Sequence, residues 1–333
     1  MNLYLTKINH RIKKCLRPSF TFYQIHKNGQ AIQWESTLIL PKEKGHQIMK
    51  LENKVIRLMA DYGAAGDLAF SEVEDRLHHQ IRPIQAQKFE DGVMLNYHIE
   101  ITPVRAFSSV ENAFLTAQLA INSPLGSDYI IYNNVAPRKD DLTARQKNAG
   151  EPFIYLKLKN GVQVITVNSG FSATLLKPFA DEIKIVTVDN DKTQFRSRDN
   201  YPKILGSIMR EDWSILGDDG FDAVPDDFPT HTIVYNDGYG NLKTTVPVAE
   251  IEAHKGERRT VMINGRIQYV TVGEGIFSVQ DGEFCLAKGS SGWEMPDGSR
   301  FDFVELVKRG GSAYAEFAKP PAGLKVKFPD TEK

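Results

Sequence analysis

A Tyr-Asn-Asp-Gly-Tyr-Gly-Asn-Leu segment in the C-terminal third of the chain carries the groups with the most evident chemistry. Asp237, Tyr239 and Asn241 place a carboxylate, an aromatic ring and a carboxamide within five residues. Gly238 and Gly240 allow the backbone to turn sharply there and to approach another group closely. A solvated hairpin turn needs only the Asp-Gly pair, and this purely structural interpretation holds for the motif taken alone. The additional ring and amide suit a flat heterocycle with a charged tail.

Two other segments offer polar groups of a similar kind. Asp61 ends an apolar run in the sequence Leu-Met-Ala-Asp-Tyr-Gly, and Ser290 and Ser291 precede a glycine, with Gly-Gly-Ser-Ala following at residues 310–313. The carboxyl end of a sheet strand is where open α/β sheets bind ligands. A carboxylate there can accept hydrogen bonds from both hydroxyls of a ribose. The alternative for Asp61 alone is a turn or helix cap.

By the order and separation of these segments, the chain resembles the S-adenosylmethionine hydroxide adenosyltransferases and the related fluorinases and chlorinases over roughly residues 54 to 320. The resemblance implies that S-adenosylmethionine is the substrate, with no other cofactor and no metal. It assigns the ligand contacts as Asp61 for the ribose, Asp237 for the methionine amino group, Tyr239 and Asn241 for the adenine, and Ser290 and Ser291 for the carboxylate.

The reaction implied by this resemblance is displacement at C5′ by water or halide, which expels methionine. A sulfonium leaves readily, so the enzyme must desolvate and align the nucleophile. The hydrolytic branch assigns an Asp, an Arg and a His to the water, and this chain has Asn134, Asp141 and Arg196 in their places. Ser197 matches the serine that donates to the halide in the fluorinase, although Pro137 stands where the halogenating branch has a threonine.

The candidate catalytic residues are therefore Asn134, Arg196 and Ser197. If Arg196 points inward, it would repel the sulfonium and favour an anionic nucleophile, and if it points outward it has no role in the reaction. Both orientations are open from the sequence. The alternative function is a catalytically inactive protein that binds S-adenosylmethionine or adenosine and has lost the triad.

A different class of enzyme is suggested by Ser172, which follows a predicted strand and precedes a predicted helix, as in a nucleophile elbow. Thr174 stands where that elbow needs a second glycine, which disfavours a serine hydrolase. His78 and His79 are adjacent, so they point to different faces of a helix and predict no metal site.

The amino-acid composition limits the kinds of partner and the cellular compartment that we expect for this protein. The 333 residues include 41 Lys and Arg and 42 Asp and Glu, a balance that argues against a nucleic-acid binder. Cys15 and Cys285 are far apart and predict no disulfide, as expected in a reducing compartment. Without an apolar run typical of a signal peptide or membrane span, the sequence predicts a soluble cytoplasmic protein.

Periodicity predicts an α/β N-terminal domain with a smaller all-β, barrel-like C-terminal domain. The predicted parts are an N-terminal strand pair in residues 1–50, an α/β domain in 51–225, and a β-barrel domain in 226–333, with a linker at 218–229. Strands are expected at 19–23, 31–40, 55–60, 129–132, 154–158, 162–167, 183–188, 234–235 and 242–248, and helices at 71–81 and 108–119. The resemblance further implies a homotrimer whose sites lie between one N-terminal domain and a neighbour's C-terminal domain.

Overall fold

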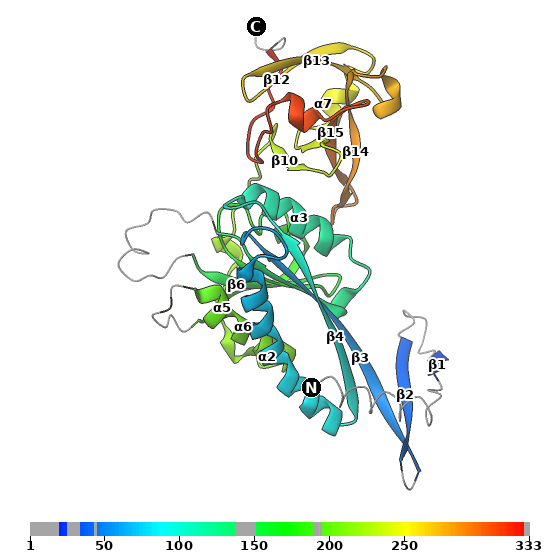
Figure 1. The fold of residues 1–333 in the computed structure, drawn as a ribbon, viewed down its shortest axis with the longest axis vertical. Coiled ribbons are helices and arrows are strands. Elements are labelled where there is room, and N and C mark those ends of the chain that lie inside the picture. Colours follow the sequence, from blue (N-terminus) through cyan, green and yellow to red (C-terminus); the bar gives the residue numbers. More distant parts are fainter. Residues whose placement is uncertain are drawn as a thin grey trace.

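The computed structural model describes residues 20–24, 34–42, 45–136, 151–188, 193 and 195–329. It contains a mixed α/β part and a β-rich part (Figure 1). The α/β part is built on a nine-stranded sheet in the order β1-β2-β3-β5-β7-β6-β8-β9, with β4 paired to β3. The β-rich part is a six-stranded sheet in the order β10-β11-β15-β14-β13-β12.

The nine-stranded sheet is organised around β3. Its strands are β3 (Gly45–Ala60), β4 (Val93–Pro103), β5 (Tyr129–Asn134), β6 (Phe153–Leu158), β7 (Gln163–Val167), β8 (Ala180–Val186) and β9 (Leu216–Asp219). Both β4 and β5 run parallel to β3, and β7 runs parallel to β5. The carboxyl ends of these four strands therefore share one edge of the sheet.

The predicted N-terminal strand pair is confirmed. β1 (Phe20–Gln24) pairs antiparallel with β2 (Trp34–Lys42), which in turn pairs with the beginning of β3. Residues 27–29, whose Lys-Asn-Gly sequence is typical of a hairpin turn, lie outside the described residues. The pair lies at the far end of the arm formed by β3 and β4 (Figure 1).

Helices cover both faces of this sheet because successive strand residues face opposite sides. α2 (Leu68–Glu90), α5 (Arg196–Asp199) and α6 (Tyr201–Met209) lie on one face, and α3 (Ser109–Ile121) lies on the other. Short 3₁₀ turns complete this part: η1 (Gly126–Asp128), η2 (Lys177–Phe179), η3 (Trp213–Ile215) and η4 (Phe221–Ala223). Ser108 caps α3, since its hydroxyl accepts the N–H of Glu111 at 3.3 Å. None of the described helices is long and apolar enough to cross a membrane.

Four sequence predictions need correction. β4 was missed because it lies at the sheet edge with one face open, so its apolar residues do not form a continuous run. The segment after β7 forms turns and η2 instead of the expected helix. The strand predicted to reach Val248 stops earlier, because Val248 begins α7. The predicted linker begins inside β9, which pairs with β8.

The β-rich part consists of β10 (Ile233–Asn236), β11 (Leu242–Thr244), β12 (Arg258–Ile263), β13 (Arg266–Val272), β14 (Phe284–Glu294) and β15 (Arg300–Lys308). Three short helical segments accompany them, α7 (Val248–Glu252), η5 (Ile276–Ser278) and α8 (Ala313–Glu316). The sheet is mixed, because β13 and β14 are parallel. Lys325 bridges Thr232 beside β10, and Lys327 bridges Met262 in β12, so one C-terminal segment contacts both ends of the strand order. The sheet therefore curls into a half-barrel.

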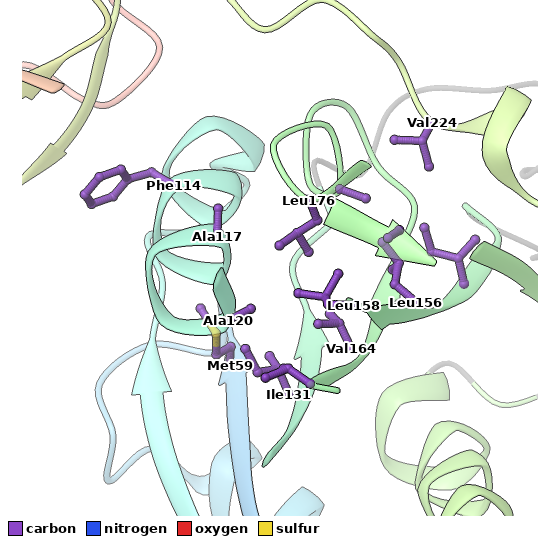
Figure 2. Close-up of a cluster of buried hydrophobic side chains, with 14 of the residues drawn as sticks. Met59, Phe114, Ala117, Ala120, Ile131, Leu156, Leu158, Val164, Leu176 and Val224 are labelled. Atoms are coloured by element: carbon purple, nitrogen blue, oxygen red, sulfur yellow. The ribbon is translucent and has the colours of Figure 1, made fainter. Parts of the chain in front are cut away.

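One hydrophobic cluster joins the two parts. In the α/β part, this cluster contains Met59 and side chains of α3 and of the neighbouring strands (Figure 2). Phe114 projects from α3 on the side away from Leu158 and Val164 (Figure 2). Its ring meets Phe303 of β15 edge to face, with 4.8 Å between centroids. The core is thus continuous between the two sheets.

Candidate functional site

The carboxyl edge of the parallel strands brings two of the predicted residues together. Asp61 follows β3 directly, and Asn134 is the last residue of β5. The Asp61 N–H donates to the Asn134 carbonyl at 3.4 Å. The Asp61 carboxylate accepts the N–H of Phe107 at 3.0 Å, which ties the loop after β4 to the same edge. Phe107 has a left-handed backbone conformation, with φ of 64°. The loop therefore holds a residue in an unfavourable conformation beside Asp61, the residue predicted to bind the ribose.

Ser197 joins this edge through Tyr62, a residue of the strand-end motif to which the sequence assigned no role. The Tyr62 ring packs edge to face on Phe70 and Phe195, with centroids 5.1 and 5.8 Å away. Its hydroxyl is buried beside the side chains of Ser197 and Asn134, yet makes no hydrogen bond of good geometry. Burial raises the pKa of Tyr62, so the hydroxyl stays protonated and can donate.

Ser197 lies on α5 and is buried. Its carbonyl accepts the hydroxyl of Tyr132 in β5 at 3.0 Å, which fixes α5 against the sheet. Arg196 is half-buried, and its guanidinium lies over the ring of the buried Tyr201, 5.6 Å from the centroid. This contact fixes Arg196 against α6, and its orientation relative to a bound ligand stays a prediction.

A charged clamp holds α5 to α2. Arg198 donates to Asp199 at 2.8 Å and to Glu72 at 3.2 Å. Hydrogen bonds from Arg198 and Thr193 lower the pKa of Asp199 to about 2. The clamp therefore keeps Ser197, one residue away, in place through charge-assisted bonds.

The C-terminal motif forms the turn between β10 and β11, as predicted. The Asp237 carboxylate accepts the N–H groups of Tyr239 and Asn241 at 2.9 and 3.0 Å, and the Asn241 amide at 3.0 Å. Asp237 and Asn241 thus stabilise the turn itself. The Tyr239 side chain is 83% exposed and free to contact another molecule.

A series of contacts connects this turn to the sheet edge that carries Asp61. The carbonyl of Gly240 accepts the N–H of Tyr314 in α8 at 2.8 Å. Arg105, from the loop that reaches Asp61, lies over the Tyr314 ring at 5.1 Å. Arg105 also faces the buried carboxylate of Glu111 at 3.6 Å, and burial raises the pKa of Glu111.

Ser290 and Ser291 are not brought to that turn. The turn adjoins Leu242, which lies level with Leu286 of β14 through β15, and Ser290 is four residues farther along β14. Ser290 is exposed, and its N–H donates to Glu305 at 3.4 Å. The carboxylate of a ligand bound there would lie beside the carboxylate of Glu305, which is paired with Lys243. The carboxylate role predicted for these serines stays a prediction.

The alternative sites considered from the sequence find no support in the geometry. The Ser172 hydroxyl is buried and donates to the Ser169 carbonyl at 2.8 Å, so it is not presented as a nucleophile. His78 pairs with the Tyr97 hydroxyl at 2.9 Å. In the described ranges, no three His, Cys, Asp or Glu side chains are grouped as a metal site.

A pocket of about 420 Å³ lies elsewhere, at the amino end of β5. Its lining includes Lys50, Lys54 and Trp213 and none of the predicted site residues. The candidate site is therefore separate from this pocket.

Neither a family model nor a curated protein matches this sequence. Two solved structures are similar in fold. One is an uncharacterized conserved protein from Thermotoga maritima, with a TM-score of 0.58, 14% identity, and coverage of 82% of this chain and 99% of that chain. The other is a conserved hypothetical protein from Thermus thermophilus, with a TM-score of 0.53, 14% identity, and coverage of 83% and 99%. At this identity the likeness shows the fold alone.

Proposed function

We propose that this protein binds S-adenosylmethionine and catalyses nucleophilic displacement at C5′, releasing methionine. One observation carries the proposal. Asp61 and Asn134 lie on adjacent strand ends, and the Tyr62 hydroxyl lies beside the side chains of Asn134 and Ser197, although these residues come from three distant parts of the sequence. This edge of an α/β sheet is the usual location of a nucleotide-type ligand.

The roles follow from the chemistry of each group. Asp61 accepts the ribose hydroxyls, and Ser197 and Asn134 donate to the attacking group. Arg196 supplies a positive charge beside it, which favours an anion and disfavours close approach of the sulfonium. The electron pair of the C5′–S bond leaves with methionine while a lone pair of the nucleophile forms the new bond. No acid is needed for this leaving group.

The second candidate is a binding protein without turnover. Asn134 occupies the place of a carboxylate in the hydrolytic branch and cannot take a proton, and such base catalysis is typically worth about 10²–10⁴-fold. The lack of a base at this position favours a site that binds its ligand and lacks the reaction.

We further propose a cytoplasmic homotrimer with domains at residues 51–225 and 226–333. The support is the exposed Tyr239 ring, which is placed to reach a ligand held by the Asp61 edge of a neighbouring copy. Light scattering of the purified full chain tests this. A strict monomer at all concentrations contradicts it.

Calorimetric titration with S-adenosylmethionine, and separately with adenosine, tests binding. We expect Asp61→Ala to weaken binding at least about tenfold, because two charge-assisted hydrogen bonds are lost. Asp181→Ala is the matched control, since Asp181 is an exposed carboxylate on β8. If the wild type gives neither heat nor a thermal shift with either ligand, the proposed function fails.

Incubation with S-adenosylmethionine, followed by liquid chromatography, separates the two candidates. Adenosine indicates hydrolysis, and a 5′-halogenated nucleoside in chloride or fluoride indicates the halide reaction. Binding with unchanged substrate in every condition supports the second candidate.

A further inference from the structure

Tyr62 carries a buried hydroxyl that lies beside Ser197 and Asn134 and forms no hydrogen bond of good geometry with the described part of the chain. Its oxygen is shielded from solvent and makes no hydrogen bond among the described residues. Buried hydroxyls are nearly always paired, and leaving one unpaired destabilises the folded state. The nearby Tyr132 follows the rule, since its hydroxyl donates to the Ser197 carbonyl at 3.0 Å.

The surroundings of the Tyr62 hydroxyl indicate which group it would bind. Phe70 and Phe195 hold the ring from two sides, so the hydroxyl has little freedom to turn toward another partner. The side chains beside it are Ser197 and Asn134, the two groups proposed to surround the attacking group. A phenylalanine would pack on the same two rings without the cost of a buried polar atom.

We infer that the Tyr62 hydroxyl is the hydrogen-bond donor that holds the attacking group, an inference that rests on the proposed function. The group that completes this site is a small acceptor, water or a halide ion. It accepts the Tyr62 O–H on one lone pair and attacks C5′ with another. The C5′–S electron pair leaves with methionine, and an attacking water releases its proton to solvent while a halide has none to release.

Stability without ligand gives the first test, using the full-length wild type, Tyr62→Phe and Tyr155→Phe. Tyr155 is the matched control because it is a buried tyrosine of the same sheet whose hydroxyl donates to Gln163 at 3.1 Å, away from the site. We expect Tyr62→Phe to melt above the wild type and Tyr155→Phe to melt below it. A Tyr62→Phe variant that melts lower has lost a hydroxyl with an existing partner, which overturns the inference.

Turnover of S-adenosylmethionine gives the second test, measured in water alone and with sodium chloride or sodium fluoride. We expect Tyr62→Phe to lower kcat about tenfold, the effect of one hydrogen bond to the attacking atom, and to change the Kd of the substrate less than twofold. Tyr155→Phe should keep the wild-type kcat. The arm in which the loss occurs identifies water or halide as the attacking group.

The outcomes separate the inference from the proposed function. A wild type that turns over substrate and a Tyr62→Phe variant with equal kcat overturn the inference and leave the function standing. A wild type that binds but never consumes S-adenosylmethionine also overturns this role for Tyr62. A wild type that binds no S-adenosylmethionine overturns the proposed function and, with it, the role of Tyr62.

Discussion

The backbone of Gly240 lies directly against the side chain of Ser312. A Cβ atom built on Gly240 would stand 2.0 Å from the Ser312 Oγ, and the residue has φ of +82°. The Ser312 hydroxyl is already hydrogen-bonded, because it accepts the N–H of Ala315 at the start of α8. The β10–β11 turn therefore fits against α8 only with glycine at this position.

Gly240→Ala should destabilise the protein by about 2 kcal/mol or more, from steric contact and left-handed strain together. Gly238→Ala is the control in the same turn, because a Cβ at Gly238 would meet no atom within 4 Å and its φ is not in the left-handed region. Urea unfolding of both variants checks this. Equal losses in the two would contradict the assignment of the constraint to Gly240.

Glu111→Gln should change how stability depends on pH. Burial raises the pKa of Glu111 above its ordinary 4.5, so the folded state holds the proton more tightly than the unfolded chain. As pH rises through this window, the wild type loses stability relative to Glu111→Gln. Unfolding free energies measured between pH 4 and 7 should diverge in favour of the variant.

The exposed Glu211→Gln serves as the control for loss of a negative charge. A difference between Glu111→Gln and the wild type that stays constant across this range would show that the Glu111 carboxylate is not the titrating group.

Asp199→Asn should have the opposite pH dependence. The folded pKa of Asp199 is about 2, below the ordinary 3.8, so its contribution is present above pH 4 and is lost as pH falls toward 2. We expect the variant to be less stable than the wild type by about 1 kcal/mol at pH 7, allowing for solvent screening. Unfolding of both proteins from pH 7 down to pH 2 should bring their stabilities together.

Trp293→Ala should destabilise both sheets at once. Trp293 is 2% exposed and contacts Phe301 and Phe303 in the cluster that joins the two parts. Loss of a large buried side chain costs about 3–5 kcal/mol. We expect one cooperative unfolding transition in the wild type by fluorescence and circular dichroism. Two separate wild-type transitions would show that the shared core does not couple the parts.

Short sequence patterns determined the helix caps and turns, because their hydrogen bonds join residues that are close in the sequence. Ser108 and Glu111 are three residues apart, and the cap of α3 formed where that spacing placed it. The Asp-Gly-Tyr-Gly-Asn segment became the predicted turn, because its carboxylate finds its donors within the next four residues. Likewise, Asn264 and Gly265 both have positive φ and join β12 to β13 as a tight hairpin.

The tertiary structure decided what depends on distant neighbours. Asp61 and Asn134 meet because β3 and β5 pair in parallel with Ala60 opposite Asn134, a register set by the packing of two sheet faces. Gly238 and Gly240 are the same residue type two positions apart, and only contact with α8 makes one of them irreplaceable. Tyr62 looked like one more aromatic residue in a strand-end motif. Its significance depends on a hydroxyl that lies beside Asn134 and Ser197 and is unpaired among the described residues, and such a relationship exists only once the chain has folded.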